Sequence, residues 1–261
     1  MPIDYVKRDG VAYITLNNPA KANILDKPTS DEISQAWTDL WEDRSIRCAI
    51  LTGAGGHFSS GADLKAMGTP SESEHVRNRM AESPNLHWKA LLRDYRLTKP
   101  LIAAVEGYAV AGGTEMLQGT DIRVAGEGAI FGVWEGKRGL FPLGGSAIRL
   151  PRQIPYTIAM DILLSSKPVS AIEAKEIGLI GRVVPDGTAL DAAKAIAEQV
   201  AACGPLSTQA ILRAWRETEY MTEAEAMPIQ DTIGWEVFAS EDAQEGPRAF
   251  AEKRAPQFKG K

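Results

Sequence analysis

The sequence predicts an α/β fold in which a strand-containing core is followed by a helical C-terminal region. Strand-type segments concentrate before about residue 185, and nearly every segment after it has helical periodicity. The chain has 261 residues, 44% of them hydrophobic and 24% charged, which is ordinary for a globular protein. We expect a core over residues 1–200 and a helical region over residues 201–261.

The N-terminal segment predicts a hairpin followed by a helix. Asp9-Gly10 separates apolar residues 3–6 from residues 11–16, and Asp-Gly favours a tight hairpin turn. Thr29, with Glu32 three residues later, is typical of a capping box at a helix start. Apolar side chains then recur at helical spacing, which indicates a helix of about four turns. These side chains are Ile33, Trp37, Leu40 and Trp41.

The segments between this helix and residue 100 have weaker signals. Cys48 to Thr52 has the composition of a third strand. The glycines that follow it do not form a dinucleotide-binding fingerprint, because Phe58 stands where a glycine would be needed. Residues 67–97 are polar and compatible with helix, so we expect a loop with one or two helices there.

Residues 100–145 contain the pattern with the clearest chemical meaning. The apolar run from Leu101 to Val105 predicts a strand, and it leads through Gly112-Gly113 into a helical pattern that begins near Thr114. A glycine pair between a strand and a helix lets the backbone approach a ligand closely. The first N–H groups of a helix are unpaired and partly positive, so we expect an anion site here.

Two acids accompany this expected anion site. Glu115 follows the glycine pair by two residues, and Glu135 follows the apolar residues 131–134. Two carboxylates beside a backbone anion site indicate acid/base catalysis next to an oxyanion hole. The alternative is that Glu115 is an ordinary first-turn helix acid and Glu135 a solvated loop acid. The helix start should favour ionised Glu115, and desolvation behind Trp134 should favour neutral Glu135.

The C-terminal half has several helix boundaries. Pro155 suits a first helical turn. Ser170 with Glu173 predicts a second capping box, and Gly178 predicts the end of that helix. Residues 180–184 form a short strand in this interpretation, and helices follow from residue 188 onward. Thr222 with Glu225 predicts a third capping box.

Composition and motifs exclude several classes of protein. The formal net charge of −5 disfavours a nucleic-acid partner, whose binding surface should be basic. The 3 histidines form no metal-ligand pattern, so we expect no metal. The sequence has neither a nucleophile elbow nor a P-loop, which disfavours a standard serine hydrolase and a nucleotide hydrolase. No apolar run reaches the roughly 18 residues of a membrane span. The 2 cysteines form no C-x-x-C pair, which favours a reducing, cytoplasmic location.

Several segments together resemble the crotonase superfamily of enoyl-CoA hydratases and isomerases, along essentially the whole chain. They are LNNPAKANIL (16–25), ILTGAGGHFSSGADLKAM (50–67), KPLIAAVEGYAVAGGTEMLQGTDIRVA (99–125), FGVWEGKRGLFPLGG (131–145), AKEIGLIGRVV (174–184) and EGPRAFAEKRAPQF (245–258). The resemblance implies a core built as a spiral of ββα units and a C-terminal helical trimerisation region. It therefore also implies a homo-oligomer, either a trimer or a dimer of trimers.

The resemblance also implies roles for individual residues. It places the two oxyanion-hole N–H groups on Ala62 and Gly112, and the two hydratase acids on Glu115 and Glu135. An acyl-CoA thioester is the implied substrate, and no cofactor is implied because coenzyme A is part of that substrate. Lys21 would meet a phosphate as a point charge, or else it is a solvated loop lysine. The implied contacts with CoA are Lys21, Ala22, Ala62, Asp63, Leu64, Lys65 and Gly112.

Three positions depart from the usual hydratase pattern: Ala111, Trp134 and Leu143. Backbone N–H groups survive all three changes, so the departures concern the shape of the acyl pocket. The chain most resembles hydratases of bulky or branched acyl-CoA, including those of steroid side chains. We therefore expect an enoyl-CoA hydratase that adds water across a 2,3 double bond. The alternatives are an isomerase, which needs one acid, and a non-catalytic acyl-CoA-binding protein.

Overall fold

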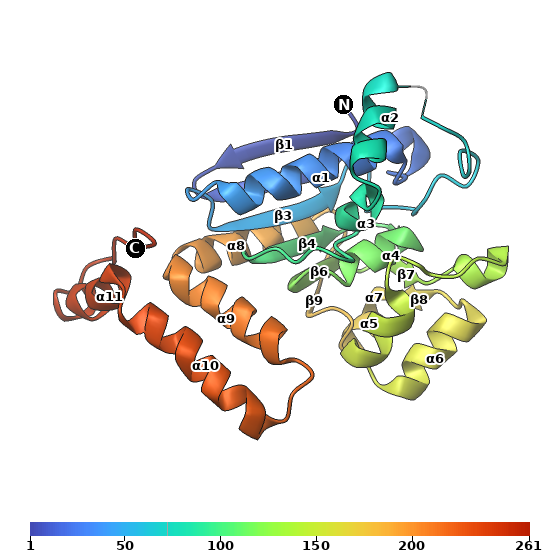
Figure 1. The fold of residues 1–261 in the computed structure, drawn as a ribbon. Helices are drawn as coiled ribbons and strands as arrows, with labels where there is room; N and C mark the ends of the chain where they lie inside the picture. The colour runs from blue at the N-terminus through green and yellow to red at the C-terminus, as the bar shows by residue number, and fades with distance from the viewer. Residues whose placement is uncertain (72) are drawn as a thin grey trace.

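A six-stranded sheet forms the centre of the computed structural model, which describes residues 1–71 and 73–261 (Figure 1). The strand order is β1-β2-β3-β4-β6-β9, and only the β1–β2 pair is antiparallel. The strands are β1 (Ile3–Arg8), β2 (Val11–Leu16), β3 (Cys48–Gly53), β4 (Leu101–Val105), β6 (Ile122–Gly126) and β9 (Arg182–Val184). The strands predicted over β1, β2, β3 and β4 are confirmed, β9 is shorter than its predicted range of 180–184, and β6 was not predicted.

The N-terminal hairpin and helix form, but the helix begins differently from the prediction. Asp9 and Gly10 have φ of 51° and 76°, the geometry that the Asp-Gly turn predicts. Helix α1 (Lys27–Glu42) has Asp26 as its N-cap, whose carboxylate accepts a hydrogen bond from Thr29 N at 2.9 Å. Glu32 instead accepts from Ile3 N at 3.1 Å. The predicted Thr29–Glu32 capping box is therefore wrong.

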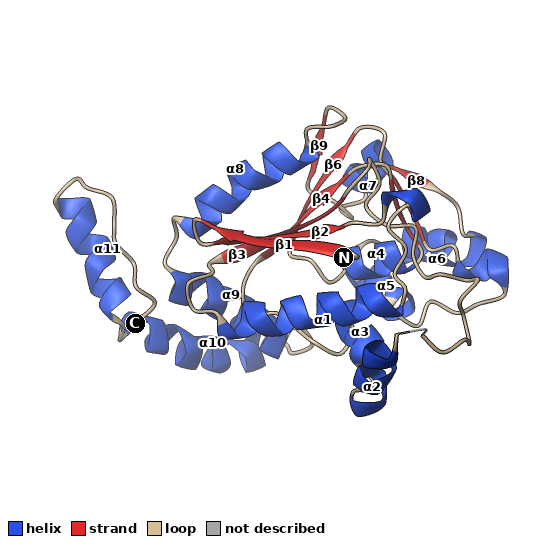
Figure 2. Ribbon diagram, turned by 90° about the horizontal axis from the view of Figure 1, so that it is seen from above, coloured by secondary structure: helices blue, strands red, loops and turns tan. Residues whose placement is uncertain are grey.

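The sheet is buried on both faces, as is usual for parallel strands. Leu51 and Val105 face the larger core, where α1 buries Trp37 completely. Ile50 and Ile102 face the other side, which helix α8 (Ala189–Ala201) covers (Figure 2). The predicted helical face of α1 is thus part of the core, although Trp41 at its end is 50% exposed.

A smaller sheet completes the predicted ββα units. It contains β5 (Tyr108–Val110), β7 (Ile130–Gly132) and β8 (Val169–Ser170), in the order β5-β7-β8. One unit runs through β4 and β5 into α4 (Gly112–Leu117), and the next through β6 and β7 into the 3-10 helix η2 (Glu135–Arg138). Since β5 and β7 are parallel neighbours, the chain leaves both strands at the same edge. This pairing brings the segments that contain Glu115 and Glu135 together.

The remaining elements agree with most of the predicted boundaries. Ser170 caps α7 by accepting from Glu173 N at 3.2 Å, and Thr222 and Glu225 form the predicted capping box of α10. Pro155 is the N-cap of α6 and lies just outside the first turn. The sequence did not predict α5. These elements are η1 (Pro19–Lys21), α2 (Glu74–Glu82), α3 (Leu86–Ala90), α5 (Ser146–Gln153), α6 (Tyr156–Ser165), α7 (Ala171–Glu176), α9 (Pro205–Thr218), α10 (Glu223–Phe238) and α11 (Glu241–Ala251).

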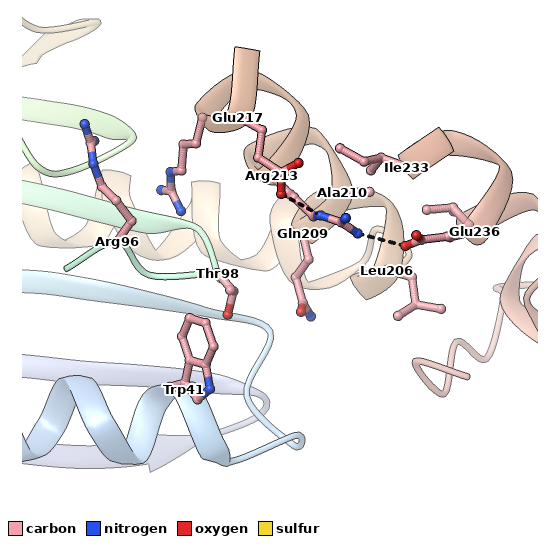
Figure 3. Close-up of a pocket in the computed structure, with 12 residues that line it drawn as sticks. Trp41, Arg96, Thr98, Leu206, Gln209, Ala210, Arg213, Glu217, Ile233 and Glu236 are labelled. Carbon is pink, nitrogen blue, oxygen red and sulfur yellow. Dashed lines mark hydrogen bonds and ion pairs between the residues drawn. The ribbon is translucent and has the colours of Figure 1, made fainter. Parts of the chain in front are cut away.

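The C-terminal helices extend away from the sheet, and α11 lies farthest from it (Figure 1). Arg213 of α9 joins Glu217 of the same helix and Glu236 of α10, each at 2.8 Å (Figure 3). Trp235 and Phe238 of α10 are 69% and 72% exposed. Within the described ranges, the helices are all too short or too polar to cross a membrane.

Candidate active site

A cavity of roughly 370 Å³ lies between α3, α4, η2 and the loop that precedes α5. Its wall is mainly apolar and includes five of the predicted site residues: Ala62, Leu64, Gly112, Glu115 and Glu135. The cavity in Figure 3, between α9, α10 and Trp41, is larger at roughly 510 Å³. It contains none of the predicted site residues, so we take the cavity with the acid pair as the candidate site.

The backbone segments around Ala62 and Gly112 pack directly against each other. Gly61 has φ of 85°, and a Cβ built on it would lie 2.9 Å from Gly112 N, so a larger residue does not fit. A Cβ built on Gly112 would lie 3.7 Å from Ala62 N. The N–H groups of Ala62 and Gly112 therefore lie close together on the cavity wall.

Hydrogen bonds hold these two segments in place from opposite sides. Gly61 O accepts from Leu25 N at 2.8 Å, and Ala111 N donates to Gly132 O at 2.7 Å. Ala111 has the sparsely populated conformation φ 50°, ψ −125°, a local strain of the kind that surrounding contacts must maintain. Gly112 is the first residue of α4, where the N–H has no acceptor within the helix. Among the described residues, neither this N–H nor that of Ala62 has an acceptor.

Glu115 is buried, with 4% of its surface exposed, and its carboxylate is held by the start of the next helix. Gly144 N donates to Oε2 at 3.0 Å, and Ser146 N donates to Oε1 at 3.1 Å. These donors favour the ionised form, but burial has the larger effect and raises the pKa of Glu115 above its usual range. The expectation that a helix start would favour ionised Glu115 is therefore wrong in its net direction.

Glu135 follows β7 and begins η2, with its carboxyl group in the same cavity. Burial, and to a smaller extent the nearby charge of Glu115, raise its pKa to about 7. Its Oε2 is buried and has no hydrogen-bond partner among the described residues. The expectation that desolvation favours neutral Glu135 agrees with this environment.

Several cavity residues were not predicted from the sequence. His87, Trp88 and Leu91 come from α3 and its C-terminal end, in the segment whose structure the sequence left open. Burial lowers the pKa of His87, whose Nδ1 lies 2.9 Å from Ser30 Oγ. Ala111, Trp134 and Leu143, which the sequence associates with the shape of the acyl pocket, also line the cavity. The remaining unpredicted lining residues are Leu25, Ser60, Met67, Arg138, Leu140, Phe141 and Gly144. The apolar residues Leu140 and Phe141, next to Leu143, were a sequence signal that could have identified the rest of the rim.

The residues expected to contact CoA gather beside the cavity. Ser60 N donates to Ala22 O at 2.9 Å, which places the segment 21–22 against the segment 60–65. Lys21 has a side chain that is 61% exposed, with Nζ 3.7 Å from Asp63 Oδ2. Asp63 Oδ1 also accepts from Lys65 N at 3.0 Å, which orders the turn. The structure thus brings the predicted contacts together, with Lys21 free to reach solvent.

In the described part of the chain, no group of three or more His, Cys, Asp or Glu side chains lies close enough together to bind a metal ion. The site consists instead of two adjacent backbone N–H groups and two buried carboxyl groups in an apolar cavity. Such an arrangement defines the class of enzyme that polarises a carbonyl group beside a pair of acids.

The chain belongs to the enoyl-CoA hydratase/isomerase family, whose sequence model matches residues 6–261. It is 54% identical to enoyl-CoA hydratase EchA19 of Mycobacterium tuberculosis over 98% of this chain and 95% of that protein. It is 37% identical to (E)-benzylidenesuccinyl-CoA hydratase of Thauera aromatica, over 100% of both chains. A crystal structure of an enoyl-CoA hydratase from Mycobacterium tuberculosis H37Rv superposes with a TM-score of 0.88, at 39% identity over 100% of this chain and 99% of that one.

These comparisons confirm the predicted crotonase superfamily and its fold. They also confirm the expected activity, because the similarity to an enoyl-CoA hydratase extends over nearly the full length of the chain. The protein is therefore a hydro-lyase of the enoyl-CoA hydratase type.

Proposed function

We propose that hydration takes place in the cavity that holds Glu115 and Glu135, with the thioester oxygen bound by the N–H groups of Ala62 and Gly112. The observation that supports this most directly is the convergence of both acids and both free N–H groups on one apolar cavity. An acyl-CoA substrate fits the family to which the chain belongs.

The oxyanion hole would act when water adds to the β-carbon. The thioester carbonyl then takes on enolate character, and its oxygen becomes more negative than in the bound substrate. Two fixed N–H donors stabilise that charge without having to reorient during the reaction. Each such donor is worth roughly 3–4 kcal/mol in other oxyanion holes.

The two acids would divide the proton transfers. The attacking water loses a proton, and Glu115 accepts it because two backbone N–H groups orient its carboxylate. The α-carbon gains a proton from Glu135, whose pKa of about 7 leaves it partly protonated near neutral pH. The charge of Glu115 favours the protonated form of Glu135, which suits this division of roles. An isomerase would need only one of these acids, so the presence of both favours hydration.

The acyl group that best fits the cavity is bulky and apolar. Leu140, Phe141 and Leu143 line its rim and are partly exposed, Phe141 to 64%. Trp88 and Leu91 add further apolar surface to the cavity wall. A branched, aromatic or steroid side-chain acyl group would cover more of this apolar surface than a short linear chain. The similarity to a hydratase named for benzylidenesuccinyl-CoA supports the same choice.

The CoA moiety would lie along the segments that contain Lys21 and Asp63. Ala22, Leu64 and Lys65 complete this surface, and Lys21 would meet a phosphate group. Coenzyme A would be part of the substrate, and no separate cofactor is assigned. The exposed free thiol of Cys203 is compatible with a reducing, cytoplasmic compartment.

Residues 201–261 would form the oligomerisation region, in a trimer or a dimer of trimers. Its helices carry several large apolar side chains at the surface. A single exposed apolar side chain is common in proteins, but a larger group of them is typical of an interaction surface. These side chains include Ile211, Trp215, Tyr220, Trp235, Phe238 and Phe250. A symmetric homo-oligomer would bury them between identical subunits.

The test is a panel of 2-enoyl-CoA thioesters of increasing bulk, beginning with crotonyl-CoA and extending to branched and cyclic acyl groups. Hydration is followed as loss of the enoyl-thioester absorbance, and the products are identified by mass. We expect hydration, with kcat/KM rising as the acyl group covers more of the rim. Double-bond migration without water addition would support the isomerase instead. Tight thioester binding without turnover would support a non-catalytic acyl-CoA-binding protein.

A further inference from the structure

A chain of buried polar side chains ends on the carboxylate of Glu115. Gln118 is the C-cap of α4, three residues after Glu115, and Ser146 is the first residue of α5. Both are almost completely buried, with 1% and 0% of their surface exposed. Gln118 Nε2 donates a hydrogen bond to Ser146 Oγ at 2.8 Å. Two polar side chains thus meet at full burial directly behind an active-site acid.

The direction of this hydrogen bond determines what the serine hydroxyl does next. An amide NH₂ group only donates, so Ser146 Oγ acts as the acceptor and keeps its own proton available. Ser146 N already donates to Glu115 Oε1, so the same residue places its hydroxyl beside that carboxylate. The Ser146 hydroxyl is one of the groups that favour ionised Glu115 and so oppose the effect of burial on its pKa. The hydroxyl therefore acts on Glu115 in the same direction as the two backbone donors, Gly144 N and Ser146 N.

Hydrogen bonds fix the backbone of Gln118 in place. The backbone carbonyl oxygen of Gln118 accepts from Gln153 Nε2 at 2.9 Å and from Arg123 Nη2 at 3.2 Å. These bonds hold the C-terminal end of α4 against α5 and β6. Because the backbone is anchored, the Gln118 side chain has a defined position from which to orient the serine hydroxyl.

We propose that Gln118 and Ser146 are positioning residues, which act through a Gln118–Ser146–Glu115 chain to orient the Glu115 carboxylate and keep it a proton acceptor for water. This inference rests on the proposed function, in which Glu115 accepts that proton. Neither residue is among those that line the cavity. Gln118 acts only through Ser146, and Ser146 only through Glu115.

Other charged groups also face Glu115 and must be kept constant in any test. Glu135 of η2 opposes ionisation of Glu115 through like charge, whereas the cationic Arg149 of α5 favours it. Arg138 of η2 and His87 of α3 line the same cavity. All four remain in place when Gln118 or Ser146 is changed, so a change in pH dependence can be assigned to the polar chain.

The experiment compares the parent homo-oligomer with Ser146→Ala and Gln118→Met, which removes the amide donor while nearly keeping the volume. Hydration of the best thioester is measured by single turnover as a function of pH, with thioester binding measured in parallel. Losing a donor to a carboxylate favours its protonated form, so the acid limb of the rate should move to higher pH. For Ser146→Ala we expect about a tenfold loss near pH 6 that shrinks as pH rises, the scale of one hydrogen bond to a charged group. Gln118→Met should show the same pattern with a smaller loss, because the hydroxyl remains.

The matched control is Thr52→Val, which removes a buried hydroxyl that donates to Ala104 O at 2.9 Å, on β3 and in contact with neither acid. It should leave the pH profile at that of the parent. A loss that is equal at every pH in Ser146→Ala and Gln118→Met would overturn the inference, because it would indicate a structural role. An unchanged profile in correctly folded variants would overturn it as well. If the parent enzyme hydrates no thioester in the panel, the proposed function itself fails, and that outcome is seen before any variant is compared.

Discussion

Replacing Glu135 by glutamine should make the protein more stable at high pH while it removes activity. The pKa of this acid is about 7 in the folded protein, against an ordinary value of 4.5. At 1.36 kcal/mol per pKa unit, this difference corresponds to about 3 kcal/mol of preference for the neutral form. Part of the side chain is exposed to the cavity, and solvent screening reduces the expected effect to about 2 kcal/mol.

The sign follows from proton binding in the two states. Between pH 4.5 and about 7, folded Glu135 holds a proton that the unfolded chain has already released. The folded state therefore binds more protons, and the free energy of unfolding falls as pH rises through this window. Glutamine has no charge to desolvate, so Glu135→Gln should be about 2 kcal/mol more stable than the parent near pH 8 and close to it near pH 4.

Urea unfolding of the parent and Glu135→Gln at several pH values, at one fixed protomer concentration, measures this difference. Glu176→Gln, at an exposed acid of α7, is the matched control and should show no comparable gain. Hydration by Glu135→Gln should fall by roughly 10²–10⁴-fold at every pH. A stability difference that stays constant from acid to alkaline pH would refute the reasoning, because it would mean that Glu135 is not destabilised as an anion. Hydration at the parent rate would refute its role as proton donor.

Three further predictions concern the second acid, the oxyanion hole and assembly. Glu115→Gln should lower single-turnover hydration by roughly 10²–10⁴-fold, with much less change in thioester affinity. The double variant Glu115→Gln/Glu135→Gln should be little slower than the slower single variant. Additive losses would show that the two acids act independently. Gly112→Pro removes one donor at the first position of α4, where proline is otherwise tolerated, so turnover should fall by at least about 10²-fold in a folded protein. Near-parent turnover would remove Gly112 from the oxyanion hole. Trp235→Glu with Phe238→Glu places two charges on the exposed apolar face of α10 and should dissociate the oligomer in sedimentation velocity; an unchanged sedimentation coefficient would place the interface elsewhere.

Local sequence patterns were sufficient to predict a turn or a helix cap where no distant residue competed for the same hydrogen bonds. Asp9-Gly10 determines a turn because few other pairs tolerate two positive φ angles. Thr222 and Glu225 cap α10 for a similar reason, since both partners lie within one turn. The Thr29–Glu32 prediction failed because Asp26 was a competing cap and Glu32 found a partner, Ile3 N, 29 residues away. Long-range contacts of this kind are not visible in a local pattern.

The active site likewise combines features that local sequence patterns predict with features that contacts between distant segments decide. The residue types in the glycine pair, with Glu115 two residues later, indicated an anion site beside an acid, and the resemblance added Ala62. The sequence also indicated that desolvation favours neutral Glu135, but only the tertiary structure determined the net direction of the pKa of Glu115. The two backbone donors to Glu115 come from residues 29 and 31 positions later in the chain, and its burial outweighs their effect. Glu135 reaches the same cavity because β5 and β7 pair in parallel. Burial and pairing depend on how distant segments pack, whereas turns and caps depend on a few adjacent residues.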